Sequence, residues 1–444
     1  MTSNRFARTA RHLAAALLAA PLLTSCWGDL VTDQTIGSPA PPAAGEMFAR
    51  YVAIGTSIGA GIQSGGINDS TQKQSYPYLL ARSMGLTPGV NWAYPSFTNP
   101  GCPPPYTNPL TGARVTPTGF PTSTASSCYV RSAASVSPVM TNVSIPGIRI
   151  QQVLDLTAIP FGPTDTLKLA QFITGGVNPI DMAERVQPTF VTFEAFANDA
   201  LGAATRGDTT LLTDSTAFHA AFTAIADRLD ATGAHVATMN LPTAPLIPHF
   251  SAGFLFFCLK NGCAPLGIAA TLPFSLATFT ADSTCRHAAL SAGVGVGDST
   301  LVPFPTLATM AGAITTAGVT NVNLNCATGA ATITTPLGTS SAGATIVRAE
   351  YRAIFRRIRE FNSVITSEAT ARGWALADWN TALQQQAALG TIPAFPSLTT
   401  PTTTLFGTIF SLDGIHPNAL GHRIIVDAFR TAIASTFGVN LPVP

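Results

Sequence analysis

One stretch near the start of the chain constrains its fold more than any other. The apolar run 51–54 leads directly into a turn of small residues, Gly55–Gly61. A continuous apolar run is typical of a parallel strand that is buried on both faces. Open parallel sheets bind their ligands at the carboxyl ends of such strands. Because glycines on both sides of Ser57 allow a tight bend that exposes a hydroxyl group, we expect Ser57 to be a nucleophile.

Strand-like and helix-like segments alternate along the rest of the chain, which predicts βαβ units and a parallel sheet. We expect about five strands, at 51–54, 90–94, 188–193, 235–241 and 374–379. We expect helices near 76–84, 148–156, 215–231, 344–372 and 417–437. In the last helix, Leu420, Ile424, Ala428 and Ile433 recur at helical spacing and are expected to face the core.

Two long segments interrupt this alternation and are predicted to be insertions, at about 97–141 and 244–343. They divide a predicted domain at 48–438, which a short tail at 439–444 follows. The second insertion carries a phenylalanine-rich stretch, His249–Phe257. This stretch either roofs a pocket for an acyl group or packs the insertion against the core.

Six cysteines follow Cys26, and an even number in an exported chain favours disulfides. Six cysteines allow about fifteen pairings, of which neighbour pairing is the simplest. The expected pairs are Cys102 with Cys128, Cys258 with Cys263, and Cys285 with Cys326. Zinc binding is the alternative, but paired Cys-x-x-Cys motifs are absent from the sequence, so we expect no metal site.

The first 25 residues have the pattern of an export signal. Three arginines precede a short apolar segment, Leu13–Leu23, that is shorter than the roughly 20 residues of a membrane-spanning helix. The segment ends at Leu23-Thr24-Ser25-Cys26, which resembles a bacterial lipobox. The resemblance implies lipidation of Cys26 and anchoring in the outer membrane, and an ordinary secretory peptide is the alternative. The prolines and glycine of the following segment predict a tether at 26–47.

Composition excludes some classes of protein. Only 10% of the residues are charged, 46% are hydrophobic and the formal net charge is +1. A nucleic-acid-binding protein presents a basic surface, and a disordered chain is rich in charge and poor in apolar residues. We therefore expect a folded protein that does not bind nucleic acid.

Partners for Ser57 are found just before the last predicted helix. A serine hydroxyl needs a base to remove its proton, and the base needs a third group to orient it. Asp413 stands three residues before His416 on a glycine-containing loop, so its carboxylate can accept the imidazole Nδ1–H. The other ring nitrogen would then face the serine. His422 is the other histidine near an acidic residue, and a capping or packing histidine is the alternative interpretation of His416.

Attack of a serine on a carbonyl group also needs hydrogen-bond donors for the oxyanion that forms. Gly147 follows Pro146 in a turn and can supply a backbone N–H. Asn198 follows the strand expected at 188–193 and can supply a side-chain amide. Each position alone is more often an ordinary turn or helix start.

Taken in order, four blocks resemble those of the SGNH (GDSL-type) serine hydrolases. The matching blocks are Gly55-Thr56-Ser57-Ile58, Gly147, Phe196-Ala197-Asn198-Asp199, and Asp413 with His416. Thr56 stands where the family has an aspartate, Ile58 where it has a leucine, and Phe196 where it has a glycine. The resemblance covers about 48–438 without the two insertions.

The resemblance implies a three-layer α/β/α, flavodoxin-like fold and hydrolysis of carboxylic esters without a cofactor. Ser57 would attack the ester, His416 would serve as general base and then acid, and Asp413 would orient His416. The N–H groups of Ser57 and Gly147 and the side chain of Asn198 would stabilise the oxyanion. The substrate would be a small-molecule or lipid ester.

Other interpretations remain. Residues 55–59 also spell Gly-x-Ser-x-Gly, the nucleophile elbow of α/β-hydrolases, but that fold has several strands before its serine. The glycines at 59 and 61 do not form a dinucleotide motif, because Ser64 stands where the third glycine is needed. The alternative functions are a catalytically inactive surface-binding or structural lipoprotein and a carbohydrate O-acetyl esterase. The sequence makes no prediction of the oligomeric state.

Overall fold

Four short parallel strands form the central sheet of the structure, a computed structural model. It describes residues 45–115, 139–158, 165–243, 246–271, 273–291, 295–398 and 404–444. In spatial order the strands are β1 (Tyr51–Ile54), β4 (Phe190–Phe193), β5 (His235–Met239) and β12 (Ala375–Ala377). All residues of β1 and β4 are buried, as their continuous apolar runs predict. The chain is therefore a mixed α/β protein with a four-stranded parallel sheet.

The predicted strand at 90–94 is wrong. This segment forms turns, in which Val90 is 82% exposed and Trp92 is buried in stacked contact with Tyr51 and Tyr94. Residues 139–145 lie beside β1 instead. The Ala53 N–H donates to the Thr141 carbonyl, and the Val143 N–H donates to the Ala53 carbonyl. The aromatic residues at 90–94 resembled a strand because stacking and strand pairing favour the same side-chain types.

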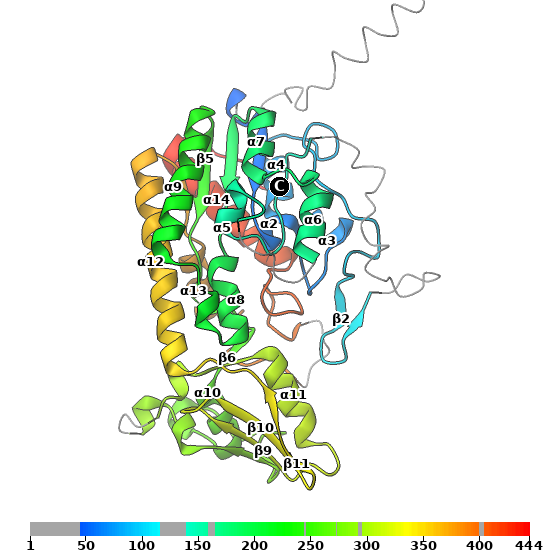
Figure 1. The fold of residues 1–444 in the computed structure, drawn as a ribbon, viewed down its shortest axis with the longest axis vertical. Helices are drawn as coiled ribbons and strands as arrows, with labels where there is room; N and C mark the ends of the chain where they lie inside the picture. The colour runs from blue at the N-terminus through cyan, green and yellow to red at the C-terminus, as the bar shows by residue number, and fades with distance from the viewer. Residues whose placement is uncertain are drawn as a thin grey trace, which may run out of the picture. The chain divides into compact units, whose positions relative to one another are not determined.

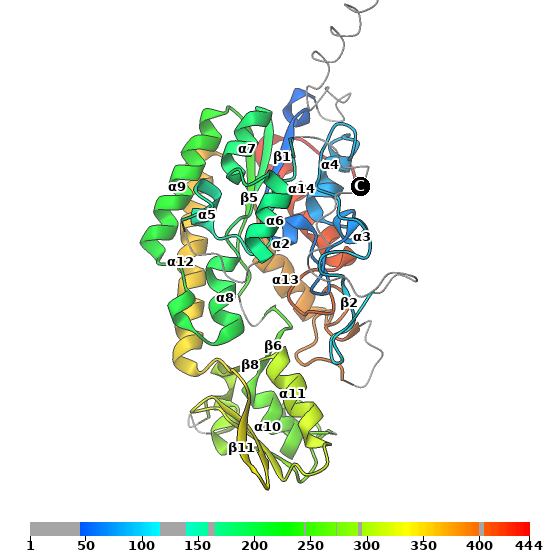
Figure 2. The same cartoon turned by 45° about the vertical axis from the view of Figure 1, so that its right-hand side comes forward.

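Helices cover both faces of the sheet, because successive side chains of a strand point to opposite faces. Val52 and Ile54 belong to one buried core, together with side chains of α9 (Ser215–Ala231) and α12 (Arg348–Arg372). Tyr51 and Ala53 belong to the other core, together with α4 (Tyr76–Ser83) and α14 (Ala419–Phe437). These elements are labelled in Figures 1 and 2, in which α9 and α12 run side by side.

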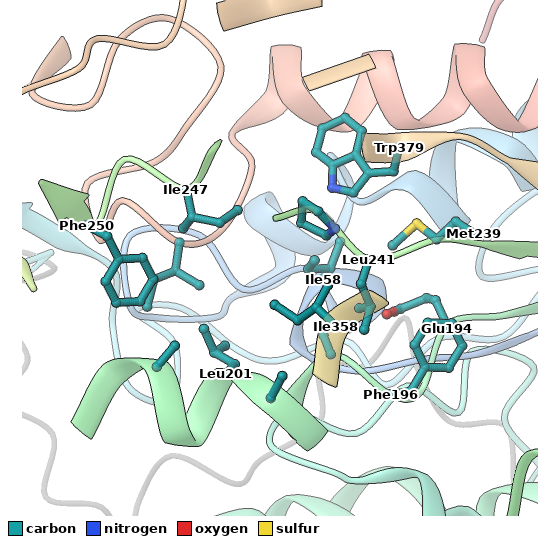
Figure 3. A pocket seen from close by; sticks show the side chains of 15 residues that line it. Ile58, Glu194, Phe196, Leu201, Met239, Leu241, Ile247, Phe250, Ile358 and Trp379 are labelled. Carbon is teal, nitrogen blue, oxygen red and sulfur yellow. The ribbon is translucent and has the colours of Figure 1, made fainter. Parts of the chain in front are cut away.

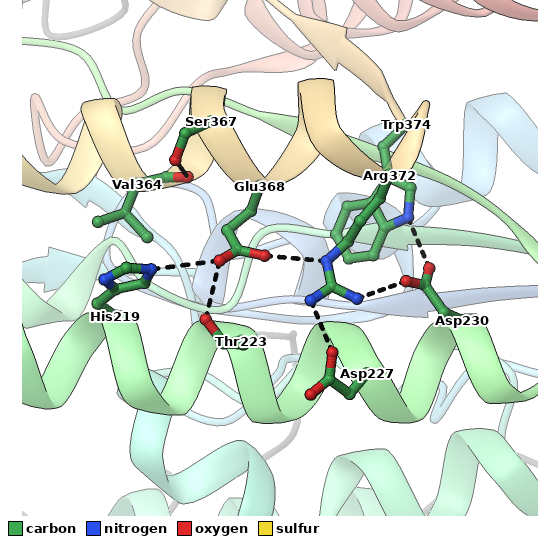
Figure 4. Close-up of polar contacts among 9 residues, drawn as sticks. All are labelled: His219, Thr223, Asp227, Asp230, Val364, Ser367, Glu368, Arg372 and Trp374. Atoms are coloured by element: carbon green, nitrogen blue, oxygen red, sulfur yellow. Dashed lines mark hydrogen bonds and ion pairs between the residues drawn. The ribbon is translucent and has the colours of Figure 1, made fainter.

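A polar network also joins α9 to α12 (Figure 4). The Arg372 guanidinium donates to Glu368 at 2.9 Å within α12 and to Asp227 at 2.6 Å on α9. It also pairs with Asp230, whose carboxylate accepts a hydrogen bond from the Trp374 indole at 3.0 Å. The pairing of these two helices therefore combines an apolar core with charged partners along one edge.

Most of the predicted helices are confirmed, and the last one differs in the face that it buries. α14 begins after Asn418, whose side chain accepts hydrogen bonds from the N–H groups of Leu420 and Gly421. Leu420 is 48% exposed, so the expectation that it faces the core was wrong. His422 is fully buried in its place. The buried residues of α14 are Gly421, His422, Ile425, Val426, Phe429, Ala432 and Ile433, so the buried face is turned away from Leu420.

The remaining elements of the core are short. Its other helices are α2 (Ser57–Ala60), α3 (Asp69–Gln72), α5 (Ile150–Leu154), α6 (Asp165–Thr174), α7 (Pro179–Val186), α8 (Asn198–Arg206) and α13 (Trp379–Ala388). Single 3-10 turns lie at Glu46–Phe48, Thr209–Leu211, Ala264–Leu266, Ser283–Cys285, Ala288–Leu290 and Gly297–Ser299. Among the described helices, none is both long enough and apolar enough to cross a membrane.

The second insertion, within 244–343, has a fold of its own. Its four-stranded sheet has the order β11 (Gly338–Gly343), β10 (Ala330–Thr335), β9 (Asn321–Asn325) and β7 (Phe279–Ala281). A second pair of strands and two helices complete it: β6 (Phe250–Ala252), β8 (Leu301–Pro303), α10 (Gly253–Asn261) and α11 (Phe304–Ile314). Disulfides join Cys258 to Cys263 and Cys285 to Cys326, which confirms two of the predicted pairs.

The first insertion is described only in part. Its described residues include the hairpin of β2 (Tyr106–Asn108) and β3 (Ala113–Arg114). Cys102 is buried, and its predicted partner Cys128 lies outside the described residues. The pairing of these two cysteines stays a prediction.

Candidate active site

Ser57 lies where β1 turns into α2, at the carboxyl end of the strand. Thr56 is the N-cap residue of this one-turn helix, and Ser57 is its first residue. The turn closes at Gly61, whose φ of +90° is in the left-handed region that favours glycine. A Cβ atom there would lie 2.7 Å from the Cα of Gln72, so the turn also needs glycine for space. This local geometry holds Ser57 at the edge of the sheet.

Ser57, His416 and Asp413 form a continuous chain of hydrogen bonds. His416 Nδ1 lies 2.8 Å from Asp413 Oδ2, and His416 Nε2 lies 2.8 Å from Ser57 Oγ. Because a carboxylate can only accept, Nδ1 carries the proton and Nε2 accepts the serine O–H. The three residues that were predicted from the sequence are therefore in contact, with the donor and acceptor roles that proton removal from Ser57 requires.

The Asp413 carboxylate is surrounded by donors. Oδ1 accepts hydrogen bonds from the N–H groups of Ile415 and His416, both at 2.8 Å. Oδ2 accepts from Gly65 N–H at 2.6 Å in addition to His416. Burial by itself would raise the pKa of this carboxyl, but His416 and these hydrogen bonds hold it below its ordinary value. Asp413 is therefore ionised at neutral pH and is fixed in one orientation.

The two segments expected to provide oxyanion donors lie against each other. Asn198, at the start of α8, donates from Nδ2 to the Ile148 carbonyl at 2.9 Å. The next residue, Asp199, accepts from Ile150 N–H at 2.9 Å. Gly147 has a φ of +82° and follows Ile145, whose N–H donates to the Gly55 carbonyl at 2.9 Å. The structure thus joins the Asn198 segment to the Gly147 segment, and the Gly147 segment to the start of the Ser57 turn.

Glu194, which sequence reasoning missed, lies directly under the Ser57 turn. It follows β4, is fully buried and accepts hydrogen bonds from the backbone and side chain of Thr56 and from the backbone of Gly59. Burial raises the pKa of this carboxyl to about 7, although those hydrogen bonds lower it. A signal was present, because Glu194 is an acidic residue directly after an apolar strand.

His249 of the second insertion is the other site residue that was missed. Its Nδ1–H donates to the Asp413 carbonyl at 2.9 Å, and its backbone N–H donates to the Gly414 carbonyl at 2.9 Å. Burial lowers the pKa of the His249 imidazole, so the ring is neutral at physiological pH. The insertion therefore contacts the loop that carries two members of the triad.

An apolar pocket lies beside these residues (Figure 3). It is lined by Ile58, Glu194, Phe196, Ala197, Ala200, Leu201, Ala204, Met239, Leu241, Pro242, Ile247, Phe250, Ile358, Trp379 and Ile415. Three of these residues are the sequence neighbours of Ser57, Asn198 and His416. The empty volume is about 680 Å³, part of it open to solvent. Apart from Glu194, the described residues that line it carry no ionisable side chain, so the pocket suits an apolar group next to Ser57 and His416.

The phenylalanines of the stretch His249–Phe257 were expected either to roof a pocket or to pack the insertion, and the structure shows both. Phe250 lines the pocket, whereas Phe256 is buried within the insertion against Phe274 and Phe395. Phe196, the departure from the family pattern, is fully buried against Phe193 and also lines the pocket. The stretch His249–Phe257 therefore both borders the pocket and packs the insertion.

His422 has a structural position. Its Nδ1 accepts the Tyr76 backbone N–H at 3.2 Å, and burial lowers the pKa of the imidazole to about 3. Cys26 and the tether that follows it, up to residue 44, lie outside the described residues. Within the described part of the chain, no cluster of three or more histidine, cysteine, aspartate and glutamate side chains could hold a metal ion.

No family model matches the chain, and no curated protein matches it.

Proposed function

We propose that this chain is a serine hydrolase that cleaves carboxylic esters, with the three-layer fold of the SGNH type. One observation carries the proposal: the two 2.8 Å contacts that join Asp413 to His416 and His416 to Ser57. The order of the blocks along the sequence and the helices on both faces of the parallel sheet support the same family.

The reaction follows from the protonation states. Ser57 Oγ forms a bond to the ester carbonyl carbon while its proton moves to His416 Nε2. The tetrahedral intermediate then collapses, the bond from carbon to the alcohol oxygen breaks, and His416 gives its proton to that oxygen. Water repeats the sequence on the acyl-enzyme and releases the carboxylic acid. Asp413 stays ionised and stabilises the imidazolium that forms in each half-reaction.

The oxyanion needs donors that no other group already uses. Among the described residues, the N–H groups of Ser57 and Gly147 have no hydrogen-bond acceptor. The Asn198 amide has a second hydrogen besides the one that it donates to Ile148. We assign these three groups to the oxyanion, as the resemblance implies.

The apolar pocket favours esters with an extended apolar acyl group. The acyl group stays attached to Ser57 in the intermediate, and the pocket begins at Ile58 and at Ala197, beside the nucleophile and Asn198. An acetyl group has only one methyl group to place against this apolar lining. Each methylene buried in an apolar pocket contributes about 0.8 kcal/mol. Carbohydrate O-acetyl esters are therefore the less favoured substrate class.

We also propose that the chain is exported and anchored in the cell envelope by a lipid on Cys26. The lipobox-like segment predicts lipidation of Cys26, and an exported chain is the usual setting for the two disulfides. Incorporation of labelled palmitate into the wild-type chain, and its loss in Cys26→Ser, would support lipidation. Equal labelling of the two chains would contradict it.

Covalent labelling tests the mechanism directly. The full chain, purified in detergent, is treated with a fluorophosphonate probe alongside Ser57→Ala and His416→Ala. We expect the wild type to be labelled at Ser57 and neither variant to be labelled. A folded wild-type protein that resists the probe and hydrolyses no ester would contradict the proposal and favour the inactive lipoprotein.

A panel of p-nitrophenyl esters from acetate to decanoate tests the substrate class. We expect kcat/KM to rise by about fourfold per added methylene until the pocket is full. Ala204→Leu narrows the pocket and should lower the ratio of decanoate to acetate activity, whereas Ala220→Leu, on the exposed face of α9, should not change it. A flat acyl-chain dependence in an active enzyme would contradict the acyl assignment.

A further inference from the structure

Glu194 has a buried carboxyl group that takes no part in the proposed mechanism. Its Oε1 accepts hydrogen bonds from Thr56 N–H at 2.8 Å and from Gly59 N–H at 3.0 Å. Its Oε2 accepts from the Thr56 hydroxyl at 3.0 Å. Thr56 precedes Ser57, and Gly59 follows it by two residues. A single side chain therefore holds both sides of the nucleophile turn.

Folding alone does not explain an acidic residue at this position. Glu194 is fully buried, and it is the only ionisable side chain among the described residues that line the apolar pocket (Figure 3). Removing a carboxylate from water is unfavourable unless hydrogen bonds compensate, and an apolar residue would extend the β4 run without that penalty. The three donors of the turn supply the compensation.

The glycines around Ser57 provide the space for this carboxyl group. A Cβ atom on Gly55 would collide with Glu194 Oε1, and a Cβ atom on Gly59 would lie 2.7 Å from the same oxygen. Thus the Gly-x-Ser-x-Gly spelling at 55–59 has a local explanation that does not involve a nucleophile elbow. The two glycines allow the turn to close over a carboxylate.

We infer that Glu194 is a positioning residue that holds the turn carrying Ser57 in its reactive geometry. The inference rests on the proposed function. The resembling family carries an acidic residue immediately before its serine, where this chain has Thr56, and here β4 provides a carboxylate to that turn instead. Glu194 binds the N–H groups of Thr56 and Gly59 but not that of Ser57, which stays available to the oxyanion. It takes no proton from the substrate and forms no bond to it.

Two substitutions at Glu194 test this role in the full chain. Glu194→Leu keeps the size of the side chain but leaves the donors of the turn without an acceptor. We expect kcat for p-nitrophenyl acetate to fall by about 10²-fold, with KM changing by less than about threefold. Glu194→Gln keeps an acceptor for both N–H groups and should recover kcat to within about tenfold of the wild type. A folded Glu194→Leu protein with wild-type kcat would overturn the inference.

A coupling measurement keeps the inference testable where Glu194→Leu does not fold. Thr56→Val removes only the hydroxyl that donates to Glu194 and should lower kcat by about fivefold in the wild type. In the Glu194→Gln background, Thr56→Val should lower log kcat by at most half as much as it does in the wild type, because the carboxyl group that accepts from Thr56 is already replaced. Full additivity would overturn the inference. Thr238→Val removes another buried hydroxyl, which donates to the Phe193 carbonyl, and is the matched control.

Hydrogen exchange separates this inference from the proposed function. Exchange of the peptide that contains 55–61 is measured by mass spectrometry in the wild type and in the Glu194 variants. We expect exchange to be at least tenfold faster in Glu194→Leu than in Glu194→Gln, whether or not the chain hydrolyses esters. Absence of probe labelling in the wild type would refute the hydrolase. Equal exchange in the two variants, or faster exchange with unchanged kcat in an active enzyme, would refute the positioning role.

Discussion

The two halves of the candidate triad are held by different parts of the molecule. The Ser57 turn is held from within the core, by the Glu194 carboxyl group that follows β4. The Asp413–His416 loop is held by groups outside the sheet: Gly65 N–H contacts the Asp413 carboxylate, and His249 contacts the Asp413 carbonyl. The Ser57 turn therefore depends on one buried carboxyl group, whereas the Asp413–His416 pair depends on loops and on the insertion. Changes in the two regions should have different consequences.

The largest effect is expected in the acid–base half, from Asp413→Asn. Both carboxylate oxygens of Asp413 accept hydrogen bonds, so an amide NH2 group in either orientation would face donors. At the Oδ2 position these are Gly65 N–H and His416 Nδ1–H, and at the Oδ1 position they are the backbone N–H groups of Ile415 and His416. His416 would then lose the tautomer in which Nε2 accepts from Ser57. We expect kcat/KM for ester hydrolysis to fall by about 10⁴-fold. Loss of less than about tenfold in a folded protein would show that Asp413 does not orient His416.

The next largest effect concerns the insertion that holds this loop. Cys285 and Cys326 are 41 residues apart, whereas Cys258 and Cys263 are 5 residues apart. On the chain-entropy account, replacing the first pair with alanine should lower the free energy of unfolding by about 4 kcal/mol, and replacing the second pair by about 2 kcal/mol. Denaturant unfolding of the full chain measures both values. The opposite order would show that loop closure does not determine the contribution of these disulfides.

A pH-dependent effect on stability is expected in the nucleophile half. The pKa of Glu194 is about 7 in the folded protein and is near 4.5 when the chain unfolds, so the folded state binds the proton more tightly. Stability from this group is therefore present below about pH 4.5 and is lost as the pH rises to about 7. The loss amounts to at most about 3 kcal/mol. Burial raises the pKa of the nearby Tyr51 and Tyr76 hydroxyls, so both stay neutral in this range.

Glu194→Gln should remove this pH dependence. Denaturant unfolding of both proteins at pH 4.5 and pH 8 measures the effect. The unfolding free energy of the variant minus that of the wild type should be larger at pH 8 than at pH 4.5. Asp199, whose pKa burial also raises to about 7, is present in both proteins and cancels in the comparison. If the difference in unfolding free energy between the two proteins is the same at both pH values, Glu194 has the same charge in the folded and the unfolded state.

The smallest effect is expected from His249→Phe, which keeps a ring at the position but removes the donor to the Asp413 carbonyl. Loss of one hydrogen bond of this kind costs about 1 kcal/mol, so kcat should fall by about fivefold. The hydrogen exchange of 55–61 should not change, because Glu194 still holds that turn. Faster exchange at 55–61 would show that the two halves of the triad are not held independently.

Much of the candidate site could be predicted from the sequence because its signals are local. An apolar run that ends in glycines indicates a buried strand and a tight turn that carries the serine, and the spacing of Asp413 and His416 lets one loop hold both side chains. The expected exposure of the serine was wrong, because Ser57 is buried, with only 8% of its surface exposed. The two confirmed disulfides also join neighbouring cysteines. The strand expected at 90–94 failed because Val90 lies in an exposed turn and Trp92 stacks on Tyr51 and Tyr94.

The sequence by itself determined the parallel α/β class and the residue types of the triad, since periodicity and short motifs depend on neighbouring residues. Only the tertiary structure decided which side chains support them. Glu194 is 138 residues from Thr56, and His249 is 164 residues from Asp413. Contacts at such separation depend on strand order and on the path of the insertion, which no local pattern encodes. The pocket beside the triad arises in the same way, because strands, helices and the insertion each contribute part of its wall.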